Sequence, residues 1–224
     1  MKRVASFFRD FSRLWLIALR LLPVIFSLRY TNQREIDPAA PDRFVQSLLF
    51  LGPAFVKLGQ VLSTRPDLLP REYTERLAEL QENAPRIDFS IIRRIVEDEL
   101  GKSIETCFEI FDPAPVAAAS LAQVHRARLS SGEWVAVKVQ RPRIETFIRR
   151  DLDALFLGLR IASWIIPARM RRTNLTAFLT EFRRYSMKEL DFGNEAVIMD
   201  RFRANFDGTS GVHIPRTWSE LSTK

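Results

Sequence analysis

The sequence of 224 residues is poor in cysteine, histidine and glycine, and each shortage excludes a class of protein or site. Its single cysteine, Cys107, cannot form an internal disulfide framework, so a reducing compartment is expected. Its two histidines, His125 and His213, are far apart and lack the ligand spacing of a zinc site. A composition of 46% hydrophobic and 27% charged residues is typical of a folded protein.

Beyond its N-terminus the sequence has no broad excess of positive charge. The first 35 residues contain seven lysines and arginines against two acidic residues, which accounts for +5 of the total charge of +7. A protein that binds nucleic acid usually spreads its basic residues over a whole face. No RNA-binding, zinc-finger or arginine-rich repeat pattern is present either, so we predict no nucleic-acid partner.

No hydrophobic run is long enough to predict an ordinary membrane-spanning helix. The apolar segment 14–28 contains Arg20 and Pro23, lacks a signal-peptide cleavage site and is shorter than the ~20 residues that a spanning helix needs. For residues 1–35 we weigh an interfacial helix on anionic lipid equally with a helix packed on its own domain. The first predicts a peripheral location on the cytoplasmic side of a membrane, and a single N-terminal membrane anchor is the less favoured alternative. Both interpretations rest on an apolar stripe, the N-terminal stripe, whose residues recur at spacings of three and four along a predicted helix. They are Phe7, Phe8, Phe11, Leu14, Trp15, Ile17, Ala18, Leu21 and Leu22.

The hydrophobic periodicity predicts an α+β fold in which a mainly helical extension, residues 40–112, precedes a domain over 113–224. Residues 31–42 are predicted to be a linker. Strands are expected at 122–129 and 134–140, joined by a glycine-containing hairpin turn, and another strand begins at His213. Because residues 134–139 do not alternate cleanly, we predict a largely buried strand there. Helices are predicted at 42–52, 53–64, 71–82, 88–100, 142–167, 174–188 and 192–205.

Glycine is also missing where a nucleotide-binding hairpin would carry it. The kinase pattern G-x-G-x-x-G-x-V, followed by a strand with A-x-K, can be overlaid on residues 117–138. Alanine occupies all three glycine positions, and the valine and the lysine are in register: Ala117, Ala119, Ala122, Val124 and Lys138. Alanine restricts the backbone more than glycine does, so we expect a stiffer phosphate-binding loop with altered nucleotide choice or phosphate placement.

Lys138 projects from an apolar strand and therefore needs a partner. The segment E-L-D-F-G-N-E-A offers the carboxylates of Glu189, Asp191 and Glu195, and the alternative is a solvated acidic turn. The triplet D-F-G within it resembles the metal-binding triplet of kinases, but no H-R-D-x-x-x-x-N loop precedes it, so we interpret it as a coincidence.

A third group of residues lies upstream, in the segment F-V-K-L-G-Q. Lys57 and Gln60 are three residues apart and share one face of a predicted helix, and Gly59 between them permits close packing. A lone lysine on such a helix is more often a surface residue whose stem lies along apolar neighbours.

These segments together resemble the aarF-domain-containing, UbiB-like atypical kinase family. The resemblance covers residue 40 to the C-terminus and includes K-L-G-Q, A-A-A-S-L-A-Q-V-H, V-A-V-K-V-Q-R-P and E-L-D-F-x-x-E-A. It implies a protein-kinase-like small lobe, ATP or ADP with Mg²⁺ as the ligand, and a link to ubiquinone or isoprenoid-lipid metabolism. It also implies that Glu195 pairs with Lys138, and that Lys57, Gly59 and Gln60 gate the site by contacting Glu189 and Asp191. The implied nucleotide-binding residues are Ala117, Ala118, Ala119, Ser120, Ala122, Val124 and Lys138.

The sequence departs from that family by ending at Lys224, before a catalytic loop or a second lobe. No catalytic set is complete and the metal ligands are unknown. We therefore expect no nucleotide turnover by this chain alone, because phosphoryl transfer needs a metal and a base-bearing loop. The expected partners are a nucleotide, a membrane surface or isoprenoid lipid, and a separate C-terminal lobe. The alternative function is a non-enzymatic, membrane-associated scaffold.

Overall fold

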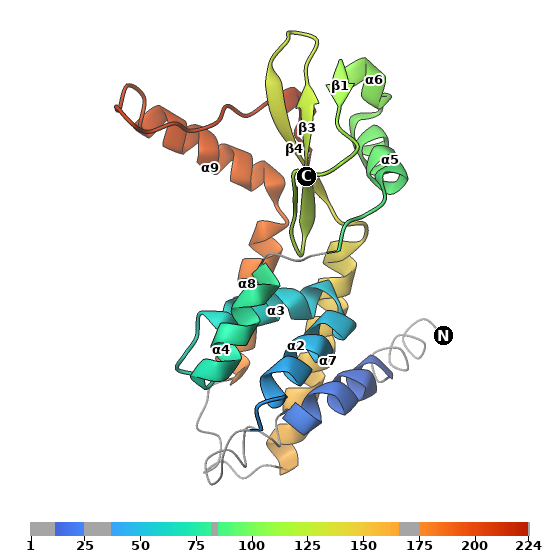
Figure 1. The fold of residues 1–224 in the computed structure, drawn as a ribbon, viewed down its shortest axis with the longest axis vertical. Coiled ribbons are helices and arrows are strands. Elements are labelled where there is room, and N and C mark those ends of the chain that lie inside the picture. Colours follow the sequence, from blue (N-terminus) through green and yellow to red (C-terminus); the bar gives the residue numbers. More distant parts are fainter. Residues whose placement is uncertain (1–11, 25–36, 82–84, 166–174, 224) are drawn as a thin grey trace. The chain divides into compact units, whose positions relative to one another are not determined.

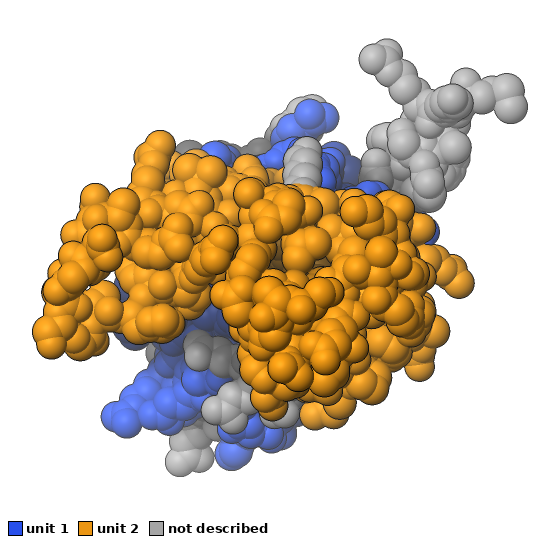
Figure 2. All heavy atoms as spheres, turned by 90° about the horizontal axis from the view of Figure 1, so that it is seen from above, with its two compact units in different colours: residues 1–85, 118–121, 143–183 blue, residues 86–117, 122–142, 184–224 orange. Residues whose placement is uncertain are grey.

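A computed structural model describes residues 12–24, 37–81, 85–165 and 175–223. The chain divides into two compact units, each assembled from separated segments (Figure 2). The first contains residues 1–85, 118–121 and 143–183, and the second contains 86–117, 122–142 and 184–224. The mixture of many helices with one small antiparallel sheet confirms the predicted α+β class.

The first unit is helical (Figure 1). It contains a helix at residues 12–24 and the N-terminal part of a helix that continues into the second unit, α8 (Leu175–Glu189). Gly52, with φ 102°, separates α2 (Ala40–Leu51) from α3 (Pro53–Ser63). Pro53 is the first residue of α3, where its missing N–H costs no hydrogen bond. The remaining elements are α4 (Arg71–Ala78), η1 (Glu79–Gln81) and α7 (Ile144–Ile165).

The core of the first unit is closed around α3. The side chains of Leu48, Phe55, Leu77 and Leu152 are almost completely buried. A Cβ atom on Gly59 would lie 2.6 Å from Leu80 Cδ1, 2.8 Å from Leu48 Cδ1 and 3.3 Å from Leu77 Cδ2. The absence of a side chain at Gly59 therefore lets α3 approach its neighbours closely.

The helix at residues 12–24 packs on its own unit. Arg13 donates to both carboxylate oxygens of Asp151 at 2.7 and 2.9 Å and also to the backbone carbonyl of Leu51. Ile17 and Val24 are buried. Phe7, Phe8 and Phe11 of the predicted stripe lie outside the described residues.

The described helices include none with the length and apolar character needed to cross a membrane.

The second unit is built on a small sheet. The long hairpin of β3 (Ala122–Arg128) and β4 (Trp134–Gln140) is antiparallel, with Val124 opposite Lys138 and His125 opposite Val137. The short strands β1 (Ile110–Phe111) and β2 (Ala117–Ala118) pair along β3. The helices are α5 (Phe89–Leu100), α6 (Ile104–Cys107), the end of α8 and α9 (Phe192–Asn205), with η3 (Ser219–Leu221) near the C-terminus.

One face of this sheet forms the core. Ile92 and Val96 of α5 and Ile104 of α6 pack with Ala127 and Val139 of the hairpin. On the same face of β3, Gln123 accepts a hydrogen bond from the backbone N–H of Ile87, and His125 is 2.9 Å from the carbonyl oxygen of Asp112. The buried polar groups on this face are thus bonded within the fold.

Two predicted features of the second unit are wrong. β4 is not largely buried: Trp134, Ala136 and Lys138 are exposed, and of its seven residues only Val139 is buried. The alternation arises because α5 and α6 pack against the opposite side of the hairpin, where Val135, Val137 and Val139 point.

The strand predicted to begin at His213 does not form either. Residues 213–218 have no regular secondary structure. Trp218 and Leu221 instead pack against the core cluster of the second unit. Burial of apolar side chains therefore holds this segment without strand pairing.

Candidate nucleotide site

The exposed face of the hairpin carries an ion pair between Lys138 of β4 and Glu195 of α9. Lys138 Nζ donates to Glu195 Oε2 at 2.6 Å, and the two side chains are 41% and 47% exposed. The same Nζ atom lies 4.3 Å from the ring centroid of Phe192. A lysine with a carboxylate partner and partial solvent access presents its remaining donors to a ligand.

The beginning of α9 is fastened to β4 close to this lysine. Gln140, two residues after Lys138 on the same face of β4, donates through Nε2 to the carbonyl oxygen of Leu190. Asp191 is the N-cap of α9 and accepts a hydrogen bond of 2.9 Å from the backbone N–H of Asn194. Asp191 of the D-F-G triplet therefore acts here as a helix cap.

The rest of the exposed face of the hairpin is partly apolar. Val124 is half-buried opposite Lys138, and Ala136 is exposed opposite Arg126. Further along the hairpin, the Arg126 guanidinium lies 3.7 Å from the ring centroid of Trp134. The face thus carries small apolar side chains beside the lysine and a cationic end.

Residues 117–122, called the alanine loop, have an exposed beginning and a buried end. Ala117 and Ala119 are exposed and Ala118 is half-buried, whereas Ser120 and Ala122 are buried. The only described non-glycine residue with a positive φ is Arg143, so every alanine of the loop has an ordinary backbone conformation. The loop does not use the left-handed conformations that glycine would allow.

Helix α3, which carries Lys57, Gly59 and Gln60, is hydrogen-bonded to this loop inside the first unit. Gln60 Oε1 accepts a hydrogen bond of 3.1 Å from Ser120 Oγ, and Gln60 Nε2 donates to the carbonyl oxygen of Leu80 at 3.0 Å. One amide therefore holds α3, η1 and the alanine loop together. Lys57, on the same helix, is half-buried.

The two carboxylates that Lys57 and Gln60 are predicted to contact lie in the second unit. Glu189 is the last residue of α8, and Asp191 caps α9. The contact of Lys57 and Gln60 with these two carboxylates stays a prediction.

The described residues contain no group of three or more His, Cys, Asp or Glu side chains arranged to hold a metal ion. Glu195 is engaged by Lys138, and Asp191 caps a helix. These residues do not fit a protein-held metal centre. Magnesium in nucleotide sites is commonly held by one or two carboxylates together with the phosphates.

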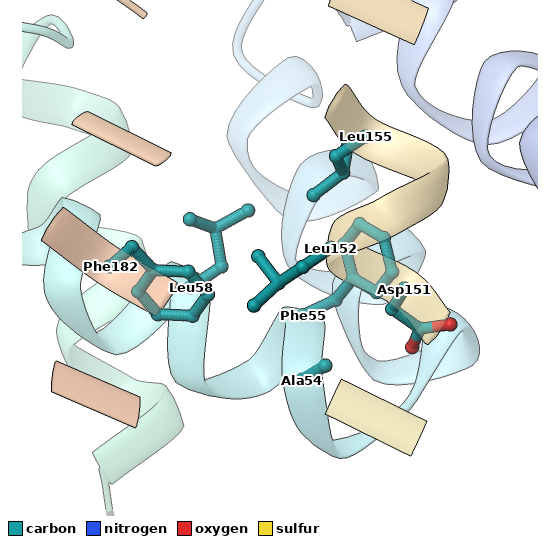
Figure 3. Close-up of a pocket in the computed structure, with 7 residues that line it drawn as sticks. All are labelled: Ala54, Phe55, Leu58, Asp151, Leu152, Leu155 and Phe182. Atoms are coloured by element: carbon teal, nitrogen blue, oxygen red, sulfur yellow. The ribbon is translucent and has the colours of Figure 1, made fainter. Parts of the chain in front are cut away.

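A small pocket in the first unit is a packing seam (Figure 3). Its side chains leave no space for a water-sized molecule. Figure 3 shows mostly apolar side chains from α3, α7 and α8 around it, with the carboxylate of Asp151 at one side. The lining residues are Ala54, Phe55, Leu58, Asp151, Leu152, Leu155 and Phe182.

Two contacts of the site were not predicted from the sequence: the ring of Phe192 against Lys138, and the bond from Gln140 to Leu190. Gln140 stands in V-Q-R-P and Phe192 in E-L-D-F, so both lie inside the quoted motifs. Gln140 is two residues from Lys138 and Phe192 is three residues from Glu195, and this closeness in sequence was the signal that could have identified them.

Comparisons with known proteins indicate the family to which the chain is similar. A family model of the ABC1 atypical kinase-like domain matches residues 79–224. The chain is 38% identical to the "Probable protein kinase UbiB" of Pseudomonas aeruginosa over 200 residues, which cover 89% of this chain and 37% of that protein. It is 41% identical to the "Uncharacterized protein sll1770" of Synechocystis over 182 residues, which cover 80% of this chain and 31% of that protein.

A solved structure is also similar. The Mycobacterium tuberculosis protein Rv3197, determined as a complex with erythromycin, matches with a TM-score of 0.51 and 29% sequence identity. The match covers 74% of this chain and 41% of that chain. The chain therefore spans less than half the length of each of these relatives.

Proposed function

The chain belongs to the ABC1 atypical kinase-like family, and on that premise we propose that it supplies the nucleotide-binding part of a UbiB-like atypical kinase. The observation that carries this proposal is the ion pair of 2.6 Å between Lys138 on β4 and Glu195 on α9. In protein kinases a strand lysine of this kind binds nucleotide phosphates and pairs with a helix glutamate. The ligand is ATP or ADP, and Mg²⁺ enters together with its phosphates.

The residues of the site have separate tasks in this proposal. Lys138 provides a positive charge for the phosphates, and Glu195 fixes the position of the ammonium group. Val124 borders the base or sugar on the exposed sheet face. The loop residues Ala117, Ala118, Ala119, Ser120 and Ala122 cover the phosphates.

We assign a regulatory task to Lys57, Gly59 and Gln60. Support comes from the hydrogen bond of Ser120 to Gln60, which connects α3 with the alanine loop. A change in the position of α3 would then change the conformation of the loop. The biological role that we propose for the complete kinase is in ubiquinone or other isoprenoid-lipid metabolism at a membrane.

Nucleotide turnover is not part of the activity that we propose for this chain by itself. The sequence contains no H-R-D-x-x-x-x-N loop. In protein kinases such a loop supplies the base and a metal ligand for phosphoryl transfer, so binding and not turnover is what we propose for these 224 residues.

Calorimetric titration of the 224-residue protein with ATP and with ADP, each with and without Mg²⁺, tests the proposal. We expect binding that weakens roughly tenfold or more in Lys138→Ala, since bonds to charged groups contribute ~1.5–3 kcal/mol. Glu195→Gln should have a smaller effect in the same direction, because it keeps the side-chain shape and removes the charge. Lys102→Ala is the matched control, because Lys102 is an exposed lysine in the turn that follows α5. Equal affinities in Lys138→Ala, Lys102→Ala and the unchanged protein would refute the proposal.

A second candidate function, a membrane-associated scaffold, is favoured by one feature of the first unit. In the helix at residues 12–24, Trp15, Leu19 and Leu22 are 62%, 55% and 46% exposed. Arg20 of the same helix lies over the ring of exposed Phe50. Such a surface combines apolar and cationic groups, as peripheral membrane contacts do.

A further inference from the structure

The ammonium group of Lys138 lies between a carboxylate and an aromatic ring. Glu195 Oε2 accepts its hydrogen bond at 2.6 Å, and the centroid of the Phe192 ring is 4.3 Å from Nζ. A cation within about 6 Å of a ring centroid is attracted by the negative face of the ring. Phe192 therefore contributes an electrostatic contact to this site as well as apolar surface.

The backbone holds this ring in place. Phe192 is the first residue of α9, directly after the N-cap Asp191, whose carboxylate accepts the backbone N–H of Asn194. Leu190, just before the cap, is buried and is bonded to Gln140 of β4. The start of α9 is thus attached to the strand that carries Lys138, so the backbone at Phe192 is held beside that strand.

The spacing of the two partners along α9 is equally informative. Phe192 and Glu195 are three residues apart, and residues at that spacing lie side by side on one face of a helix. Both can therefore contact the same ammonium group, which has three N–H donors. The carboxylate and the ring engage two of its sides, and within the described residues no further hydrogen bond of Nζ is seen.

We propose that Phe192 is a positioning residue for Lys138, with its ring face keeping the ammonium group aimed while the third N–H is offered to a phosphate oxygen. This inference rests on the proposed function, in which Lys138 binds the nucleotide phosphates. The ring attracts the cation without competing for the phosphate, since it carries no hydrogen-bonding atom. A ligand phosphate can therefore approach Lys138 without first displacing this partner.

Replacing Phe192 by phenylalanines that carry one, three and five fluorine atoms tests the ring electronically, because fluorination nearly preserves shape while it removes the negative face. The first readout needs no nucleotide: the rate of acylation of the Lys138 amine at neutral pH, followed by peptide mass spectrometry. The ring attracts a cation and not the neutral amine that reacts, so weakening its negative face by fluorination should raise the rate stepwise, by about 2- to 5-fold across the series. Phe192→Tyr should retain the slow rate, and Phe192→Leu should lose it.

The second readout is the affinity for ATP with Mg²⁺, which should weaken in the same order and by a similar factor. The same fluorinated residues at Phe202 are the matched control. Phe202 is an exposed residue on α9 whose ring stacks on Phe206 at 6.1 Å between centroids. Substitution there should change neither readout.

The two readouts separate this inference from the proposed function. An acylation rate that is flat across the fluorinated series and in Phe192→Leu overturns the inference, even where ATP binds and needs Lys138. If neither the unchanged protein nor any variant binds nucleotide, the proposed function fails. A graded acylation rate would then still show that the Phe192 ring acts on Lys138. A graded rate together with a graded affinity supports both.

Discussion

Gly59 is the residue at which the packing of the first unit depends on a missing side chain. Three buried leucines, Leu48, Leu77 and Leu80, occupy the space around its Cα atom. Two of these contacts would be shorter than 3.0 Å with a Cβ atom present, so the surrounding side chains would have to move. Overpacking of a core typically costs ~1–3 kcal/mol.

We therefore predict that Gly59→Ala lowers the free energy of unfolding by up to about 2 kcal/mol, after an opposing gain of ~1 kcal/mol in helix propensity. Urea denaturation followed by circular dichroism measures the change. The matched control is Gly193→Ala on α9, where the nearest atom to a Cβ would be Asp191 Oδ1 at an ordinary 3.5 Å. The control should be neutral or slightly stabilising. A Gly59→Ala protein as stable as the control would contradict this account of the packing.

Single residues were predictable to the extent that their role is local. The close packing expected at Gly59 follows from its place in an apolar helix, and the cap found at Asp88 is likewise a contact within its own segment. The hydrogen bond of Ser120 to Gln60 joins residues 60 positions apart, and the cation–π contact of Lys138 with Phe192 joins residues of different elements. Nothing in either segment alone encodes such a meeting, because it depends on the tertiary fold.

The start of α5 shows how the fold of an element depends on one carboxylate. Asp88 is the N-cap, and its Oδ1 atom accepts the backbone N–H of Ser90 at 2.8 Å as well as the Ser90 hydroxyl. These hydrogen bonds, the hydroxyl first and the backbone N–H second, hold the pKa of Asp88 below its ordinary value of 3.8. A lowered pKa means that the folded state favours the charged carboxylate.

The sign of the pH dependence follows from that direction. A carboxyl group with a lowered folded-state pKa contributes stability that is fully present above 3.8 and is lost as the pH falls through its folded value. We predict that the stability difference between the unchanged protein and Asp88→Asn becomes smaller between pH 5 and pH 2, as measured by thermal unfolding. Asparagine also caps helices well, so the variant should still form α5. A difference that stays constant over this range would show that the charge of Asp88 plays no part.

Elements were predicted more reliably than their surroundings. α9 begins and ends at the predicted residues, 192 and 205, and α5 begins one residue later than predicted, after the Asp88 cap, and ends at the predicted Leu100. The prediction that β4 is largely buried was wrong, because the apolar run W-V-A-V-K-V does not reveal that helices cover only one side of the hairpin. The strand predicted from His213 was wrong because β-propensity does not supply a partner strand.

At the scale of the whole molecule, the chain corresponds to 37% of the UbiB relative. Its fold contains the lysine, its glutamate partner and the alanine loop, all of which our proposal uses for nucleotide binding. The two candidate functions use different parts of the chain. The proposed nucleotide binding uses Lys138 in the second unit, and the proposed membrane binding uses the helix at residues 12–24 in the first.

That helix has both a packed and an exposed side. Arg13, Ile17 and Val24 attach it to its own unit, as the interpretation of a packed helix requires. Trp15, Leu19 and Leu22 remain exposed, so packing does not exclude a contact with lipid on the other side. The two interpretations of the N-terminal stripe are compatible in this arrangement.

Sedimentation with vesicles separates the two functions. We predict that the protein binds vesicles containing phosphatidylglycerol more tightly than neutral phosphatidylcholine vesicles, because the first 35 residues carry a net charge of +5. The triple variant Trp15→Ser, Leu19→Ser, Leu22→Ser should lose most of this binding, since each exposed apolar side chain can contribute on the order of 1–3 kcal/mol when buried in lipid. Lys138→Ala should bind vesicles as the unchanged protein does and yet bind nucleotide more weakly. Vesicle binding that survives in the triple variant would exclude this helix as the membrane contact, whatever the result for nucleotide.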